Sequence, residues 1–226
     1  MNRIDAPFPP RPLVSVILPV YNRRHLIMRA IQSVEGQTFS DWELLIVDDG
    51  STDGLESLIL PLVLEHDKYR YLKHSNRKLS TTRNIGIHAA LGEYVTFIDS
   101  DDEYKPDHLQ QRLDYFAAHP HVDVVHGGLE LVGPPESHWV RDVYNPDKLI
   151  HINDCVVGGT IFAKKMVLID SGGFKLLSYS AESELISRLE KKYRVAKVDF
   201  PTYRYYTGLE DSICTSQKKG MDELKS

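Results

Sequence analysis

The sequence predicts an α/β protein with a mainly parallel central sheet flanked by helices. Short runs of β-branched and aliphatic residues, typical of strands buried on both faces, recur along the first half of the chain. Segments with apolar residues at helical spacing lie between these runs. No stretch rich in Gly, Ser or Pro divides the chain, and 226 residues suffice for one large α/β domain. We therefore expect a single domain over residues 1–226.

Strands and helices alternate in the first half of the chain. The apolar runs predict strands at residues 13–20, 42–47, 69–73, 94–98 and 122–126. Helices are predicted at 24–35, from Ser51 or Thr52 onward, at 80–90 and at 106–119. Ser51 and Thr52 are both good N-cap residues, and either fits the start of the second helix. Such alternation is the pattern of right-handed βαβ units and a parallel sheet.

The pattern loosens after Gly127. Strands at 129–132 and 139–144, separated by a Gly-Pro-Pro turn, predict a smaller antiparallel portion. Helices are expected at 164–171 and 182–193, and short strands at 194–198 and 202–206. The tail is polar and expected to be frayed.

Composition excludes several classes of protein. A net charge of −5 gives no general attraction for nucleic acid. Cys155 and Cys214 have no metal-type spacing and are interpreted as free thiols of a reducing compartment. The first residues carry no apolar run of the signal-peptide type. The apolar runs 13–20 and 58–64 fall far short of the ~20 residues of a membrane-spanning helix. These features predict a cytoplasmic protein without a transmembrane segment.

Polar and acidic turns follow three of the predicted parallel strands. They are residues 19–22 (PVYN), 48–53 (DDGSTD) and 99–102 (DSDD). In an open α/β sheet, ligands bind outside the carboxyl ends of the strands, where strand order reverses. Each turn alone is more often an ordinary turn or a helix cap. Together they predict one crevice, whose acidic residues would repel each other unless a hard cation or hydrogen-bond donors lay between them.

These motifs closely resemble the family 2 glycosyltransferases of the GT-A fold. The resemblance includes 16–22 (VILPVYN), 45–53 (LIVDDGSTD), Arg83-Asn84 with Gly86, and 97–102 (FIDSDD). It continues through Gly158-Gly159, 172–174 (GGF) and 201–205 (PTYRY), so it covers roughly residues 13–213. The resemblance implies a nucleotide-binding half at about 13–127 and an acceptor-binding half at about 128–213, followed by a polar tail at 214–226.

The resemblance also implies a role for each residue of the donor site. Pro19, Tyr21 and Asn22 are expected to form the wall and edge of the nucleotide base pocket. Asp49 would read the base or the ribose, and Asp48 would help to position that loop. Arg83 would be the basic residue of the donor site, although pairing with an acid at the surface is equally compatible with the sequence. In the acidic turn, Asp99 would contact the ribose or share the metal, and Ser100 would lie beside the donor. Asp101 or Asp102 would ligate Mg²⁺ or Mn²⁺.

The catalytic base is expected on the helix that follows Gly172-Gly173-Phe174. Aligned on Arg188-Leu189, Glu182 falls where the family carries its catalytic Asp, and Ala181 replaces the acidic neighbour. Glu184 is the alternative, about 200° away on the helix surface. The alternative without a catalytic role is that Glu182 is a first-turn acid favoured by the helix dipole. A His that many relatives carry after the Tyr-Arg-Tyr strand has no counterpart here.

Three functions remain under consideration. The first is a metal-dependent, inverting glycosyltransferase that moves a sugar from a nucleoside-diphosphate donor, by default a UDP-sugar, to a saccharide or glycolipid acceptor. Its role would be cell-surface polysaccharide synthesis, in the cytoplasm or at the inner face of the membrane. The second is a catalytically idle nucleotide-sugar-binding relative. The third is a sugar nucleotidyltransferase, which ranks last because the loop 19–24 contains no glycine for a triphosphate. The sugar, the acceptor, the preferred metal and the oligomeric state are left open.

Overall fold

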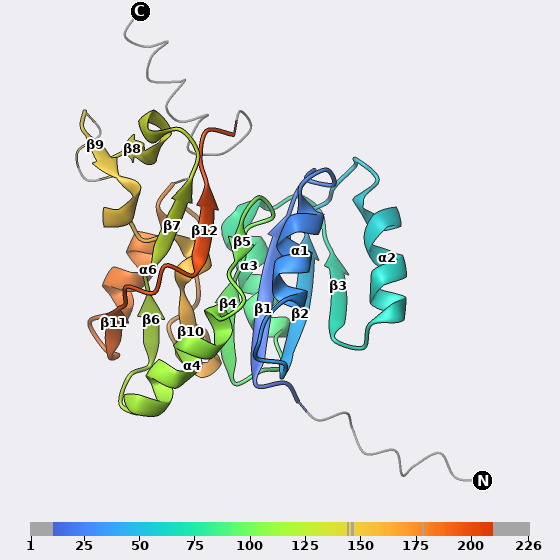
Figure 1. Cartoon of the computed structure of the whole chain (residues 1–226), viewed down its shortest axis with the longest axis horizontal. Helices are drawn as coiled ribbons and strands as arrows, with labels where there is room; N and C mark the ends of the chain where they lie inside the picture. Colours follow the sequence, from blue (N-terminus) through green and yellow to red (C-terminus); the bar gives the residue numbers. More distant parts are fainter. Residues whose placement is uncertain (1–10, 144, 146, 178, 210–226) are drawn as a thin grey trace, which may run out of the picture.

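A seven-stranded sheet runs through the middle of the molecule in the order β11-β6-β10-β4-β1-β2-β3 (Figure 1). The structure is a computed structural model and describes residues 11–143, 145, 147–177 and 179–209. The expectations for the first ten residues, for Cys214 and for the tail 214–226 lie outside the described residues. Within the described residues, no helix has both the length and the apolar character needed to cross a membrane.

The first half of the chain supplies five strands of this sheet, four helices and the short strand β5 of a smaller sheet. In chain order these are β1 (Val14–Val20), α1 (Ile27–Glu35), β2 (Trp42–Asp48), α2 (Leu55–Glu65), β3 (Tyr69–Lys73), α3 (Lys78–Ala89), β4 (Tyr94–Phe97), β5 (Glu103–Tyr104), α4 (His108–Ala118) and β6 (Val124–His126). The second half supplies β7 (Leu129–Val132), β8 (Trp139–Arg141), β9 (Leu149–His151), β10 (Phe162–Lys164), α5 (Lys165–Asp170), α6 (Ala181–Leu189), β11 (Val195–Lys197) and β12 (Tyr203–Tyr206).

Strand β1 lies between β2 and β4 and is parallel to both. Val20 is in register with Asp48 of β2, and Ile17 is in register with Phe97 of β4. The expectation that the first and fourth parallel strands are neighbours is therefore confirmed. Strand order reverses at this pair, because the chain proceeds from β1 outward to β2 and β3 before it returns to β4. The loops after β1, β2 and β4 consequently meet at one edge of the sheet.

Side chains of the central strands alternate between two apolar layers. Val16 and Leu18 of β1 pack with α1 and α4 on one face, whereas Ile17 packs with α3 and α6 on the other. Helix α1 places Ile27, Ala30, Ile31 and Val34 on the first face, the apolar stripe that the sequence predicted. This burial on both faces explains why the strands read as continuous apolar runs.

Two predicted helix starts were wrong. Helix α2 begins at Leu55 behind a left-handed Gly54, not at Ser51 or Thr52. The Ser51 hydroxyl instead accepts a hydrogen bond from the backbone N–H of Asn22, and Asp53 accepts one from the N–H of Leu55. Helix α1 begins at Ile27, because residues 24–26 form a turn. A side chain that could cap a helix can instead bond to a neighbouring loop, and the local sequence does not show which of the two occurs.

The predicted antiparallel pairing of strands 129–132 and 139–144 was also wrong. Strand β7 pairs in parallel with β12, and β8 pairs with β9; Tyr144 lies outside the described residues. The sequence also missed β10, a three-residue strand that enters the main sheet antiparallel between β4 and β6. The expected smaller sheet exists, and its order is β5-β12-β7.

Candidate functional site

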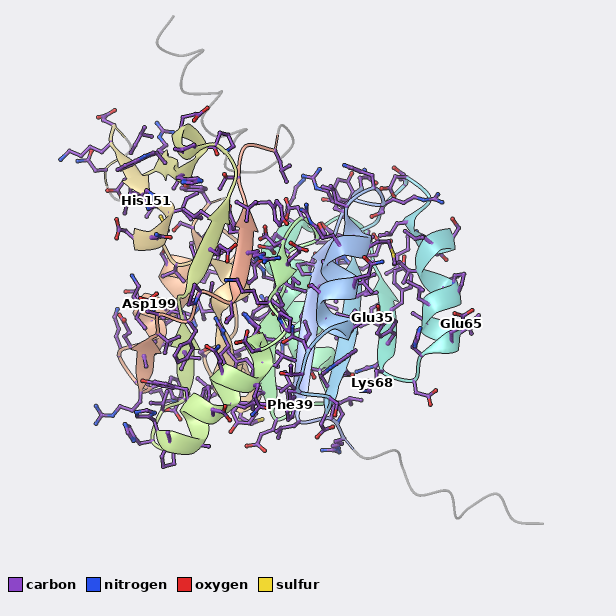
Figure 2. The ribbon with its side chains drawn as sticks, viewed as in Figure 1. Glu35, Phe39, Glu65, Lys68, His151 and Asp199 are labelled. Carbon is purple, nitrogen blue, oxygen red and sulfur yellow. The ribbon has the colours of Figure 1, made fainter. Side chains whose placement is uncertain are left out.

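The polar loops after β1, β2 and β4 lie together at the carboxyl edge of the sheet, the upper edge in Figure 1. Phe39 and Lys68 mark the opposite end, where β2 and β3 begin (Figure 2). Contacts between the loops connect the predicted site residues. We call the set formed by Asn22, Asp49, Arg83, Glu182 and the acidic turn Asp99–Asp102 the candidate site.

The loops after β1 and β2 are tied together by hydrogen bonds. The backbone N–H of Asn22 donates to the Ser51 hydroxyl at 2.9 Å, and the side-chain oxygen of Asn22 accepts from the N–H of Thr52 at 2.8 Å. Asn22 has a positive φ of 52°, a conformation that Asn tolerates better than most residues. Pro19 is buried in β1, whereas Tyr21 is 47% exposed and leaves its ring available to a ligand.

The two acids after β2 face different partners. Asp48 is fully buried and accepts hydrogen bonds from the N–H of Ser51 at 2.7 Å and the hydroxyl of Tyr71 at 2.6 Å. Its carboxylate therefore holds the loop itself. Asp49 accepts from the N–H groups of Arg77 and Lys78, at 2.6 and 2.9 Å, where α3 begins. Asp49 thus links the β2 loop to the start of the helix that carries Arg83.

Arg83 joins the acidic turn to the predicted catalytic helix. Its guanidinium donates to Asp99 at 2.9 Å and to Glu182, and the arginine side chain is only 2% exposed. It is therefore not the surface ion pair that the sequence left open. Burial alone lowers the pKa of Arg83, but the Asp99 and Glu182 carboxylates outweigh that effect and raise it. A permanently charged group is thus fixed between two acids.

A glycine turn makes room for this guanidinium. A Cβ atom at Gly158 would lie 2.6 Å from the nearer Arg83 nitrogen. The rings of Phe97 and Phe174 lie 5.9 and 5.3 Å from the guanidinium carbon, within the range of cation–π contacts. The Gly158-Gly159 motif noted in the sequence therefore packs against Arg83.

The acidic turn contains one buried carboxylate and two that are partly exposed. Asp102 is buried, and its two oxygens accept from the Tyr203 hydroxyl at 2.6 Å and the Tyr206 N–H at 2.9 Å. Burial first, then the charges of Asp101 and Asp99, raises the pKa of Asp102 well above its usual range. Ser100 is buried within the turn, whereas Asp99 and Asp101 are partly exposed. Asp102 is thus oriented toward β12.

Asp101 and Asp99 are the two partly exposed carboxylates of the turn and could hold a divalent cation. Burial and the nearby Asp99 raise the pKa of Asp101, while Arg23 and Arg29 act against that shift. A bound cation would favour the ionised form of both carboxylates, as the positive charges of Arg23 and Arg29 do for Asp101. Among the described residues, no group of three His, Cys, Asp or Glu side chains is arranged to hold a metal ion. Two carboxylates nevertheless suffice for Mg²⁺, which takes its remaining ligands from substrate phosphates and water.

The two candidate bases lie on different faces of α6. Glu182 reaches Arg83 and so joins the candidate site. Glu184 pairs with Lys175 at 2.6 Å and with Arg188 at 3.0 Å, and it lines a cavity of about 390 Å³ on the outer face of the helix. The structure therefore brings Glu182, and not Glu184, to the acidic turn.

Some residues of the site carried no identifiable signal in the sequence. Arg29 donates to the carbonyl oxygen of Asp101 and stacks on the Tyr206 ring at 3.6 Å. Its place on the polar side of an amphipathic helix is indistinguishable from that of a solvent-facing arginine. Tyr203 lies within the PTYRY motif, but its bond to Asp102 spans a sequence separation of 101 residues.

Comparison with known proteins identifies the family of the chain. The model of the family described as Glycosyl transferase family 2 matches residues 15–170. A putative teichuronic acid biosynthesis glycosyltransferase, TuaG of Bacillus subtilis, is 33% identical over 162 residues, which are 71% of this chain and 63% of that protein. The chain also matches other curated relatives, and in each of these the match covers two thirds or less of the relative's length.

Solved structures share the fold. Residues 1–349 of S. aureus TarS, in complex with UDP-GlcNAc, have a TM-score of 0.68 and 23% identity over 88% of this chain and 60% of that chain. The mannosyltransferase PcManGT of Pyrobaculum calidifontis, in complex with GDP-Man and Mn²⁺, has a TM-score of 0.68 and 22% identity over 86% of this chain and 57% of that chain. These likenesses establish the GT-A fold. Together with the family match over most of its length, they show that the chain belongs to glycosyl transferase family 2.

Proposed function

We propose that this protein is a metal-dependent, inverting glycosyltransferase. It moves a sugar from a UDP-sugar to a hydroxyl group of a saccharide or lipid-linked saccharide, in cell-surface polysaccharide synthesis at the cytoplasmic face of the membrane. The observation that carries the proposal is the buried Arg83, which joins Asp99 of the acidic turn to Glu182 on α6. This link supports a role for Glu182 as the base and for the acidic turn as the metal site.

The donor is held by the loops after β1, β2 and β4. Exposed Tyr21 and the Asn22 loop would contact the base, and Asp49, in the loop after β2, would read the base or the ribose. Asp101 and Asp99 would hold Mg²⁺ or Mn²⁺. When bound there, the metal would supply Lewis-acid stabilisation of the charge on the departing nucleoside diphosphate.

Glu182 removes the proton of the acceptor hydroxyl in the transfer step. The acceptor oxygen forms a bond to the anomeric carbon while the bond from that carbon to the diphosphate oxygen breaks. The proton passes to Glu182 and then to solvent, and the electron pair of the broken bond leaves with the diphosphate. A single displacement of this kind inverts the anomeric centre. Arg83 fixes the position of the Glu182 carboxylate during the attack.

The comparisons support the substrate class. One protein of the same fold is in complex with UDP-GlcNAc and another with GDP-Man and Mn²⁺, which supports a nucleoside-diphosphate sugar and a divalent metal as ligands of this protein. TuaG is named for teichuronic acid biosynthesis, which motivates a polysaccharide acceptor.

Thermal unfolding against a panel of nucleoside diphosphates tests the proposal. We expect UDP, and not GDP or dTDP, to stabilise the protein with Mn²⁺ or Mg²⁺, and EDTA to remove the effect. A ligand at a hundred times its Kd stabilises a protein by about 2.7 kcal/mol. Asp101→Asn should lose the metal-dependent part, whereas the exposed control Asp114→Asn should keep it. The metal assignment fails if Asp101→Asn retains the full shift, and the donor site fails if no nucleotide stabilises the wild type.

A further inference from the structure

Tyr203 contacts both ends of the acidic turn with one hydroxyl group. The tyrosine is fully buried in β12. Its hydroxyl donates to Asp102 at 2.6 Å and accepts from the backbone N–H of Asp99 at 3.3 Å. Because a hydroxyl can donate and accept at once, both bonds form together. The two residues that bracket Ser100 and Asp101 are therefore held by a single side chain.

The surroundings of the Tyr203 ring allow it little freedom. A Cβ atom at Gly159 would overlap the ring, so the ring packs directly on the glycine backbone. Tyr104 meets it edge-on, with ring centroids 5.8 Å apart. At the start of β12, Thr202 accepts a hydrogen bond from Arg112 at 2.8 Å, and both residues are buried. The hydroxyl of Tyr203 is consequently presented to the turn from a fixed position.

Strand β12 holds the second oxygen of Asp102 as well. The backbone N–H of Tyr206 donates to it at 2.9 Å. Both oxygens of Asp102 thus accept hydrogen bonds from β12. Asp99 and Asp101 of the same turn are partly exposed, and Asp99 is held by Arg83. The turn therefore contains one buried, anchoring carboxylate and two partly exposed ones.

We propose that Tyr203 is a positioning residue that, through Asp102 and the Asp99 amide, orients Asp99 and Asp101 toward the metal–diphosphate. This inference rests on the proposed function. Side chains that orient metal ligands without touching the metal typically change metal affinity by about 10–100-fold when they are replaced. Tyr203 and Asp102 would orient Asp99 and Asp101 in this way.

The test compares Tyr203→Phe with Tyr104→Phe. Each change removes one buried hydroxyl, but the Tyr104 hydroxyl donates to the carbonyl oxygen of Phe97 at 2.6 Å and does not contact the acidic turn. Free Mn²⁺ would be measured by electron paramagnetic resonance in the presence of UDP, and UDP affinity by calorimetry with EDTA. We expect Tyr203→Phe to weaken Mn²⁺ binding by about tenfold or more and to leave metal-free UDP affinity unchanged. Tyr104→Phe should bind Mn²⁺ as the wild type does.

Equal Mn²⁺ affinity in the two variants would overturn the inference. A wild type that binds no Mn²⁺ with UDP would instead overturn the proposed function, so the two failures are distinguishable. Asp102→Asn provides a second variant should Tyr203→Phe not fold, because the amide oxygen still accepts from the Tyr206 N–H. About tenfold weaker Mn²⁺ binding is expected for it. No loss would contradict the role of Asp102 as an anchor, and a loss as complete as in Asp101→Asn would make Asp102 a metal ligand.

Discussion

Arg83 is the buried cation that two carboxylates of the candidate site share. Its planar fork reaches Asp99 with one nitrogen and Glu182 with another, an arrangement that a lysine ammonium does not reproduce. Both acids are mainly buried, with side chains 24% and 17% exposed. The arginine therefore compensates charges that would otherwise repel each other within the protein.

Removing this cation should destabilise the protein more than removing the whole charge cluster. We expect Arg83→Met to lower the free energy of unfolding by about 3 kcal/mol, toward the lower end of the usual range because the acids keep some exposure. The triple variant Arg83→Met, Asp99→Asn, Glu182→Gln should recover part of that loss, since it leaves no uncompensated charge. Urea unfolding without metal measures both. A triple variant less stable than Arg83→Met would show that the three charges do not act as one cluster.

At this scale the sequence identified the kinds of residue but not their orientations. It placed Glu182 ahead of Glu184, and only Glu182 reaches Arg83. It did not rank Asp101 against Asp102, because the partners that turn Asp102 inward, Tyr203 and Tyr206, lie about a hundred residues further along the chain. The roles of Glu182, Asp101 and Asp102 toward a ligand remain predictions.

Helix α3 carries Arg83 and packs unusually closely on strand β1. A Cβ atom at Gly86 would lie 2.5 Å from the side chain of Ile17, which is fully buried. Asn84 of the same helix also pairs with the backbone of Phe174 through two hydrogen bonds of 2.8 Å. The position of Arg83 therefore depends on how close α3 sits to the sheet.

Gly86→Ala should separate α3 from β1. We expect the overlap with Ile17 to lower the free energy of unfolding by about 1–3 kcal/mol. The control Gly36→Ala has its nearest contact at 3.4 Å and should change stability by less than about 0.5 kcal/mol. Chemical denaturation measures both, and adding Ile17→Ala should make the Gly86→Ala change less costly than it is in the wild type. Equal costs for the two glycine variants would contradict the close packing.

Element prediction succeeded where the pattern was local. The parallel strands and their helices follow from apolar runs and helical stripes, and both apolar layers exist as predicted. It failed where partners are distant: β7 pairs with β12, which begins more than seventy residues later. Strand β10 escaped notice because its three residues run directly into helix α5, and the predicted helix 164–171 already included Lys164.

In the whole molecule, the second half of the chain completes the sheet begun by the first. Strand β10 enters between β4 and β6, and β11 extends the edge beyond β6. In this half of the chain, Gly158 lies against Arg83, Gly159 lies against Tyr203, and Glu182 of α6 pairs with Arg83. The candidate base and the candidate metal ligands thus come from opposite halves of the chain, and the proposed mechanism requires both to be in place.

Donor turnover in Glu182→Gln tests the role of Glu182 as the base most directly, with Glu184→Gln as the matched control on the opposite face of α6. Release of UDP from the bound UDP-sugar would be followed, with an acceptor saccharide or with water as acceptor, alongside donor affinity. We expect Glu182→Gln to lower turnover by about 10²–10⁴-fold at unchanged donor affinity, whereas Glu184→Gln retains turnover. Wild-type turnover in Glu182→Gln would show that the base lies elsewhere.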